Sequence, residues 1–389
     1  MTLPPIERYS GREQAYVKHY FLSTYIERLV HKVAGSFAQV VYVDGFSGPW
    51  QSADEDFSDT SFGIALLALR AAKVSWSKLD RQVQMKALLV EKSPKAFRAL
   101  EGLQAKYPDV QIKAFNADFR GTIDQLLAEI PTSAFAFLLL DPKGWKIPME
   151  QIAPLLRRPN SEVLFNFMFE FVNRAASMST PATVAGLDEL LPIGRWRENL
   201  AMVGAGLSEE RAAARKTVLI DAFREVLREL GDYRYVAEVP VLRPVRDRLL
   251  YSLIYATRSA TGIEVFRDSQ IKTLTEQDTV RSATKAKASR TAGQSEMFGT
   301  PEEMGPDLTQ QFLRGERAAA PRALVEIAPI APATISWGQL WPQVLALHAV
   351  RRTELNGIAV KLRNEGRLLF PDWQPGKRVP QAVYRVQRV

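Results

Sequence analysis

The chain has 389 residues, of which 46% are apolar and 24% charged, and its formal net charge is +8. These shares are the averages of folded globular proteins, so they exclude a disordered or fibrous chain, and the length predicts two or three domains. The absence of cysteine excludes disulfides, iron–sulfur clusters, thiolate metal sites and cysteine nucleophiles. Because the chain also has only three histidines, we predict no metal site.

Two further features concern location and partners. The opening segment MTLPPIERYSGREQ contains no apolar signal region, and no run of about 18 uncharged apolar residues occurs, so we expect a cytoplasmic protein without a membrane partner. The basic excess favours polyanionic partners such as nucleic acid. Most of it lies at the end of the chain, where residues 351–389 hold nine basic side chains against three acidic ones.

Strand and helix patterns alternate through the first part of the chain. Residues 12–34 carry apolar side chains at helical spacing, and the β-branched and aromatic run at 40–43 predicts a buried parallel strand. This alternation means βαβ units and a parallel sheet. The further helices are expected near 62–72, 94–107, 122–130 and 149–158, and the further strands near 86–93, 110–118, 135–145 and 161–169.

Residues 182–231 are helical in pattern and predict an insertion or a cap over the sheet. The two strand-like runs that follow, at 233–242 and 248–257, predict an antiparallel pair at the sheet edge, and class I methyltransferases end with such a pair. From about residue 282 the sequence has few large apolar residues, which is the composition of a linker. We therefore predict a first domain over 1–275, a linker over 276–330 and a second domain over 331–389.

The last segment has the outline of a winged helix-turn-helix domain. Two short helices, at 338–350 and 353–366, precede two strand-like runs joined by the basic loop 374–381, the wing loop. We assign Trp341 and Trp373 to core packing. A solvated basic face and a protein-docking module are the alternatives to nucleic-acid binding. The candidate phosphate contacts are Arg351, Arg352, Lys361, Arg363, Lys377 and Arg378.

Polar or small residues follow each predicted strand of the first domain, where ligands bind in open α/β sheets. After the first strand, Gly45 and Gly48 allow a tight turn and a close approach to a ligand. The loop lacks the full G-x-G-x-x-G pattern, which argues against NAD or FAD. The candidate cofactor-binding residues of this loop are Asp44, Gly45, Phe46, Ser47 and Gly48.

Two more acidic residues belong to the same predicted site. Glu91 ends the second strand, the position from which a carboxylate accepts hydrogen bonds from ribose hydroxyls. Asp118 follows the third strand, where methyltransferases commonly have an acid or amide that meets the adenine amino group. Their neighbours Lys92 and Phe119 complete the set. The alternative is that Asp44, Glu91 and Asp118 only cap the helices that follow them.

The fourth strand ends in Asp141-Pro142-Lys143-Gly144-Trp145. This segment resembles the Asp-Pro-Pro-Tyr-type loop of amino-group methyltransferases, in which the acid and a backbone carbonyl hold the target amino group and an aromatic ring stacks on the base. By this resemblance Asp141, Pro142, Lys143 and Trp145 are candidate catalytic residues. Lys143 stands in place of the second proline, and Trp145 lies one position beyond the usual aromatic residue. The alternative is a plain turn before the next helix.

With these residues assembled, the chain resembles the three-Cys-motif partner proteins, a bacterial family with a methyltransferase-like domain and a winged-helix tail. The similarity rests on the order of several segments rather than on one signature. It implies a Rossmann-like class I methyltransferase fold, S-adenosylmethionine as cofactor, and a three-Cys-motif protein as partner. The segments are Lys18-His19 with Tyr25, YVDGFSGPW, TSFGIALLAL, LLVEKS, LLLDPKGW and the tail from Ile335.

Two functions remain open at this point. The first is an S-adenosylmethionine-dependent methyltransferase acting on nucleic acid, with the winged helix holding the substrate through phosphate contacts. The second is a non-catalytic scaffold that keeps the fold and delivers nucleic acid to its partner enzyme, and Lys143 in the catalytic loop favours it. For Lys18 and His19 we predict a solvated helix face rather than a ligand contact.

Overall fold

The computed structural model describes residues 3–48, 52, 57–142, 144–204, 208–291 and 308–389. The chain divides into two compact units, Met1–Arg258 and Ser259–Val389. The predicted end of the first domain at residue 275 is therefore too late, because the helix after the last strand of the sheet belongs to the second unit. Among the described residues, no helix is both long and apolar enough to span a membrane.

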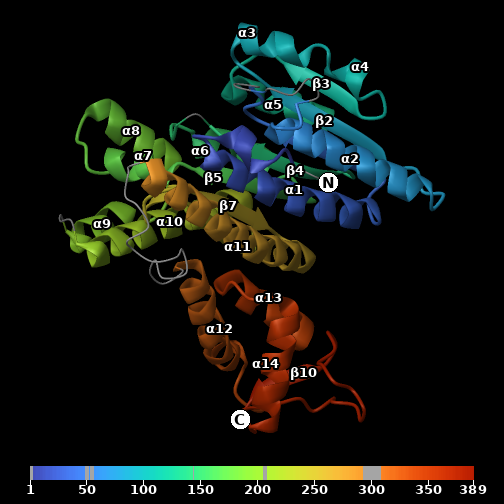
Figure 1. Cartoon of the computed structure of the whole chain (residues 1–389). Coiled ribbons are helices and arrows are strands. Elements are labelled where there is room, and N and C mark those ends of the chain that lie inside the picture. The colour runs from blue at the N-terminus through green and yellow to red at the C-terminus, as the bar shows by residue number, and fades with distance from the viewer. Residues whose placement is uncertain (1–2, 49–51, 53–56, 143, 205–207, 292–307) are drawn as a thin grey trace. The chain divides into compact units, whose positions relative to one another are not determined.

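A seven-stranded sheet forms the centre of the first unit, in the order β3-β2-β1-β4-β5-β7-β6 (Figure 1). β1 to β5 run parallel, and β7 pairs antiparallel with both β5 and β6. The expected parallel sheet and its antiparallel edge pair are both confirmed, and the unit is a Rossmann-like α/β fold. The strands are β1 (Gln39–Asp44), β2 (Gln84–Val90), β3 (Gln111–Phe115), β4 (Phe135–Leu140), β5 (Ser161–Phe167), β6 (Tyr235–Leu242) and β7 (Leu249–Thr257).

Helices cover both faces of this sheet. α1 lies against α2 on one face, where Tyr25 of α1 donates a hydrogen bond to the buried Glu162 of β5 over 2.5 Å. The α-helices are α1 (Glu13–Ala34), α2 (Ser61–Ser77), α3 (Pro94–Phe97), α4 (Leu103–Lys106), α5 (Ile123–Glu129), α6 (Met149–Leu156), α7 (Phe169–Ala175), α8 (Pro181–Leu190), α9 (Trp196–Val203) and α10 (Glu209–Gly231). Three 3₁₀ turns, η1 (Ile6–Tyr9), η2 (Arg98–Leu100) and η3 (Phe119–Thr122), complete the unit.

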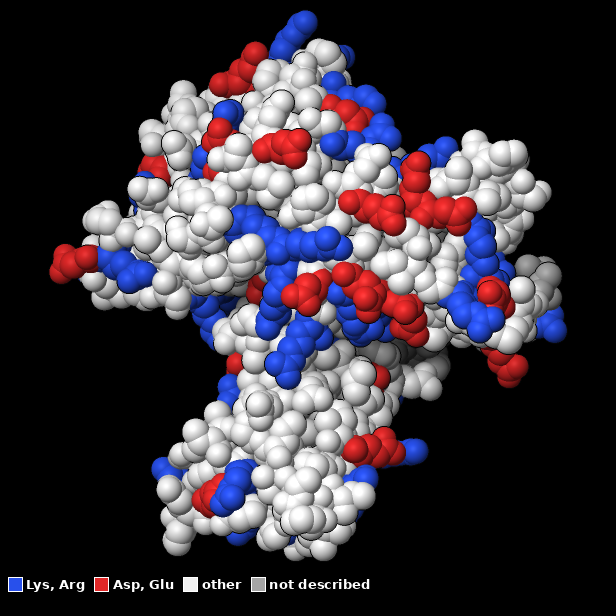
Figure 2. Space-filling model, turned by 180° about the vertical axis from the view of Figure 1, so that it is seen from behind, with Lys and Arg blue, Asp and Glu red and all other residues white. Residues whose placement is uncertain are grey.

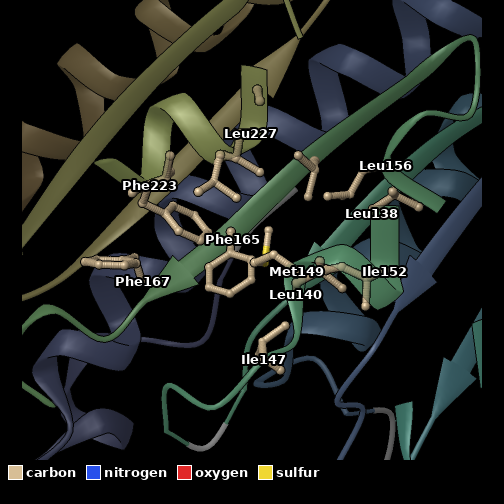
Figure 3. Close-up of a cluster of buried hydrophobic side chains, with 14 of the residues drawn as sticks. Leu138, Leu140, Ile147, Met149, Ile152, Leu156, Phe165, Phe167, Phe223 and Leu227 are labelled. Carbon is tan, nitrogen blue, oxygen red and sulfur yellow. The ribbon is translucent and has the colours of Figure 1, made fainter. Parts of the chain in front are cut away.

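The main apolar core lies on the opposite face of the sheet from α1. Phe165 and Phe167 lie on the same face of β5, and both pack against Phe223 of α10 (Figure 3). Their ring centroids are 4.6 and 4.9 Å from that of Phe223. Side chains of α6, among them Met149 and Ile152, pack into the same cluster. Because α8, α9 and α10 contribute to this core, the predicted helical insertion at 182–231 is confirmed as helical and is an integral part of the unit.

The second unit begins with a long helix rather than a linker. The predicted linker over 276–330 is wrong in large part, because α11 (Ala260–Thr291) and α12 (Leu308–Ile327) occupy most of it. Residues 292–307 lie outside the described residues, and 328–330 follow α12 without helical structure. The lysine- and alanine-rich composition that suggested a linker is equally compatible with a helix, since both residues are strong helix formers.

A small helical and β-sheet cluster ends the second unit. Its elements are β8 (Ile335–Ser336), α13 (Trp337–Leu347), α14 (Arg352–Asn364), β9 (Leu368–Leu369) and β10 (Arg385–Arg388), with sheet order β8-β10-β9. A capping box between Ser336 and Gln339 starts α13. Gly366, with φ +71°, closes α14. Trp341 is buried as predicted, and Trp373 is half-buried against Phe370 and Tyr384.

Candidate functional site

A cavity of ≈ 560 Å³ opens where β1, β2 and β4 end and beside the segment that follows β3. Parallel strands end at the same edge of a sheet, so residues far apart in sequence meet there. The volume is that of a typical small-molecule or cofactor site. The predicted residues on the lining are Gly45, Phe46, Glu91, Lys92, Asp118, Phe119, Asp141, Pro142 and Trp145. Lys143 lies outside the described residues.

Glu91 is held in a defined position on this lining. The residue is only 4% exposed, and its Oε1 accepts a hydrogen bond from the backbone N–H of Ser93 over 2.5 Å. The Asn116 carboxamide donates to the Glu91 carbonyl over 2.9 Å and so ties the end of β2 to the segment after β3. No hydrogen bond to Oε2 is present within the described part of the chain. One carboxylate oxygen thus fixes the side chain, and the second is available to a ligand.

Asp118 fits the capping alternative. Its Oδ1 accepts from the backbone N–H of Arg120 over 3.1 Å, at the start of η3. Lys92 and the Arg120 guanidinium each lie 3.0 Å from its carboxylate, and these contacts, Arg120 foremost, hold the pKa of Asp118 well below its usual range. Asp118 is therefore ionised and turned toward cations of the protein, while still on the edge of the cavity.

Gly45 serves packing as much as ligand approach. A Cβ on Gly45 would come within 3.0 Å of the Phe119 ring and 3.1 Å of Leu140. The rings of Phe46 and Phe119 lie with centroids 5.3 Å apart, so both aromatic side chains line one wall. The glycine thus lets Phe119 close over the end of β1, and this apolar wall suits a flat heterocyclic ring.

Asp44 lies in the interior, on the side facing α1. The residue is 2% exposed, and its carboxylate accepts from the Tyr42 hydroxyl over 2.9 Å and from the Phe46 backbone N–H over 3.0 Å. Burial raises the pKa of Asp44 to about 6. Its carboxylate shapes the turn after β1 and is not a helix cap.

A second cavity of ≈ 550 Å³ adjoins the first and shares Phe46, Asp141 and Pro142 with it. It lies on the α1 side, where Ser47 and Gly48 of the predicted loop contribute to its lining. Pro49 and Trp50, which follow them, lie outside the described residues. The two cavities meet at Asp141, so a ligand in one and a ligand in the other would approach each other at this carboxylate.

Both oxygens of Asp141 have a partner. Lys18 of α1 forms an ion pair with Oδ2, and the Asn166 carboxamide donates from Nδ2 to Oδ1 over 2.5 Å. The register explains the second contact: Leu140 of β4 pairs with Phe165 of β5, so the next residues of the two strands are neighbours. The Lys18 and Asp141 side chains are 15% and 20% exposed, which makes this a largely desolvated pair.

Asn166 has one polar atom that finds no partner among the described residues. The residue is 5% exposed, lines the second cavity, and its Oδ1 is closed to water and accepts no hydrogen bond from the described residues. Leaving a buried acceptor unpaired costs about 1–3 kcal/mol. The amide orientation follows from Asp141, because the reverse orientation would set two acceptors against each other.

Lys18 and His19 do not lie on a solvated helix face. We predicted a solvated helix face for both, but both line the second cavity. His19 is buried and bonded through Nδ1 to the Tyr9 hydroxyl over 3.0 Å, and burial holds its pKa well below the usual value, so its ring is neutral at pH 7. Only the packing of α1 over the sheet brings Lys18 to Asp141, and helical spacing alone could not show this.

The candidate phosphate contacts of the second unit fall into two groups. Lys377 and Arg378 are exposed on the wing loop, and Lys361 is exposed on α14. Arg352 and Arg363 instead lie over the rings of Trp341 and Trp373, each 4.4 Å from the centroid, and Arg352 also pairs with Glu264 at 3.4 Å. Arg351, half-buried, precedes α14. These contacts give Arg352 and Arg363 a structural role.

Charge on the face shown in Figure 2 is mixed. Lysine and arginine side chains lie next to aspartate and glutamate side chains there, so this face carries no broad patch of one sign. Among the described residues, no group of three or more histidine and acidic side chains could hold a metal ion.

The comparisons with known proteins add little to this geometry. The chain matches no family model and no curated protein. A solved structure similar to it is that of protein LPL1258 from Legionella pneumophila str. Philadelphia 1, of family DUF519. The two chains are 11% identical, the match covers 61% of this chain and 85% of the other, and the TM-score is 0.36. A TM-score this low carries no argument about fold or function.

Proposed function

We propose that the first unit binds S-adenosylmethionine and transfers its methyl group to an amino group of nucleic acid. The observation that carries the proposal is the pair of adjoining cavities that meet at Asp141. The sheet supports it as well, because its parallel strands end in the antiparallel pair that class I methyltransferases have. A cofactor in the first cavity and a target group in the second would face each other at one carboxylate.

The residues of the first cavity suit this cofactor. Glu91 offers Oε2 to ribose hydroxyls, and the aromatic wall of Phe46 and Phe119 suits an adenine ring. The methionine end would then run toward the loop after β1 and the junction with the second cavity. When bound, the cofactor supplies an electrophilic methyl group.

The chain's own residues hold the acceptor. Asp141 accepts a hydrogen bond from the target amino group and takes up the proton that the nitrogen releases. Asn166 and Lys18 keep the carboxylate oriented before the target arrives. The second unit would hold the nucleic acid through Lys377 and Arg378 on the wing loop, in the manner of a winged helix.

The two contacts of Asp141 favour the scaffold instead. Because Lys18 and Asn166 already occupy both Asp141 oxygens, the carboxylate is satisfied without any target. A protein that binds the cofactor without turnover, and presents nucleic acid to a three-Cys-motif partner protein, would keep such a closed arrangement.

Transfer of a tritiated methyl group from the cofactor to DNA and RNA decides between the two. A methyltransferase labels one of these polymers, and Asp141→Asn abolishes labelling while the affinity for the cofactor stays within about twofold. Asp188→Asn, at an exposed acid of α8, is the matched control and keeps full labelling. If the parent labels neither polymer, alone or with its partner, the scaffold function replaces this proposal.

A further inference from the structure

Asn166 stands out among the buried polar side chains because it lines a cavity and still has an unused acceptor. Its Nδ2 is committed to Asp141, and its Oδ1 accepts no hydrogen bond from the described residues. The residue stands at the end of β5, next to Asp141 in the register and on the same side of the sheet. A carbonyl in this place calls for a ligand that donates an N–H or O–H.

We propose that Asn166 determines specificity at this site, reading a neutral primary amino group of a nucleobase through its Oδ1 while Asp141 reads the same group. The inference rests on the proposed function, since it names the chemical group that the second cavity selects. An amino group has two N–H donors, and the carboxylate and the carboxamide offer one acceptor each. A base with a carbonyl, or with hydrogen in that position, would leave the Asn166 oxygen unpaired.

Two sources of N–H donors are chemically possible, the nucleobase and the ammonium of the cofactor's methionine end. The charges of the second cavity favour the neutral group. Its described lining balances cations and carboxylates, and one of the carboxylates, Asp44, has a pKa raised to about 6 by burial. An added cation would therefore meet little net attraction. The charged lining residues are Arg12, Lys18, Arg174 and Arg243 against Asp44, Asp59, Asp141 and Glu170.

The entering group must displace a neighbour, because water does not reach Oδ1 in this conformation. Lys18 holds the adjacent carboxylate through a long, flexible stem and can give way. The target amino group then replaces the lysine ammonium at Asp141.

The test compares single-stranded oligonucleotides that differ by one amino group. Adenine is compared with purine, and cytosine with pyrimidin-2-one, by fluorescence anisotropy with the full chain and without cofactor. The parent should bind the amino-bearing member of at least one pair more tightly. In Asn166→Ala that preference should fall by about threefold to tenfold, the equivalent of one neutral hydrogen bond. Asn166→Ser, which keeps a smaller polar side chain, should lose it to a similar extent.

Asn173→Ala on the neighbouring α7 is the matched control and should keep the preference, because Asn173 bonds to Arg215 away from Asp141. Melting temperatures establish that each variant is folded. The proposal is overturned if the parent shows no preference in either pair, or if Asn166→Ala and Asn166→Ser keep it. Loss of S-adenosylmethionine affinity with an unchanged preference would assign Oδ1 to the cofactor ammonium, and would equally overturn the proposal. Because the comparison needs no cofactor, failure of the parent to bind S-adenosylmethionine contradicts the proposed function alone.

Discussion

The carboxamide of Asn166 donates to Asp141 across two neighbouring strands, at 2.5 Å, while Lys18 pairs with the other oxygen from a helix 123 residues away in sequence. The two partners fix the position of the carboxylate. The arrangement joins three elements, α1, β4 and β5, at the point where the two cavities meet.

Glu91 should contribute directly to cofactor affinity. Glu91→Ala removes an acceptor whose charge-assisted hydrogen bonds are worth roughly 1.5–3 kcal/mol each, so S-adenosylmethionine should bind at least tenfold more weakly. Isothermal titration calorimetry measures the change. Glu101→Ala, at an exposed glutamate in the turn before α4, is the control and should bind as the parent does. Equal affinities in parent and Glu91→Ala would remove Glu91 from the site.

Lys18 and Asp141 should be coupled in stability. Lys18→Met and Asp141→Asn each leave a largely desolvated charge without its partner, and each should lower the free energy of unfolding by about 1–3 kcal/mol. The double variant should lose less unfolding free energy than the two single variants together. Urea denaturation should give a coupling energy between Lys18 and Asp141 of about 1 kcal/mol or more.

The control for this cycle is Lys361 with Glu365, an exposed pair at 3.9 Å whose coupling should be close to zero. Additive effects at Lys18 and Asp141 would mean that their contact contributes nothing measurable.

Asp44 should make stability depend on pH. Its folded pKa of about 6 exceeds the ordinary value of 3.8, so the folded state holds the proton more tightly between these values. The free energy of unfolding therefore falls as pH rises through this window, by about 3 kcal/mol in total. Asp44→Asn has no such group to titrate. Its free energy of unfolding, measured by urea titration, should therefore rise relative to that of the parent between pH 4 and pH 7.5. A difference between the two proteins that is the same at both pH values would contradict the raised pKa.

The wing loop should contact phosphates without reading sequence. Lys377→Ala with Arg378→Ala removes two exposed cations, which should reduce the slope of log affinity against log salt on duplex DNA by about two. Fluorescence anisotropy across a salt series measures the slope. Lys32→Ala with Lys78→Ala removes the same charge from exposed positions of the first unit and should leave the slope nearly unchanged. Equal slopes in the wing variant and the parent would show that another surface binds DNA.

Much of the first unit could be predicted from local pattern. Most of the parallel strands are short apolar runs followed by a polar or glycine-containing turn, so the sheet and most of the first cavity could be predicted from sequence alone. For Asp118, local pattern predicts a position after a strand but not the contacts of its side chain. Its pairing with Lys92 and Arg120 depends on how the following turn folds.

Two features could not be predicted for physical reasons. Lys18 and Asn166 meet Asp141 only through the packing of α1 on the sheet and the register of β4 with β5, neither of which has a signal within one segment. The linker prediction failed because the part of α11 beyond Gln277 is made of polar, small and basic residues, with Val280 as its one large apolar residue, and so shows no apolar periodicity.

Calorimetric titration of the parent protein with S-adenosylmethionine tests the central claim most directly. We predict saturable binding at one site per chain, competed by the demethylated product S-adenosylhomocysteine, which would occupy the same cavity at the ends of β1, β2 and β4. ATP, which carries the same adenosine with a triphosphate, should not compete, because the sequence after β1 lacks the full G-x-G-x-x-G pattern of phosphate-binding turns. Absence of heat and of competition at millimolar cofactor would contradict the account.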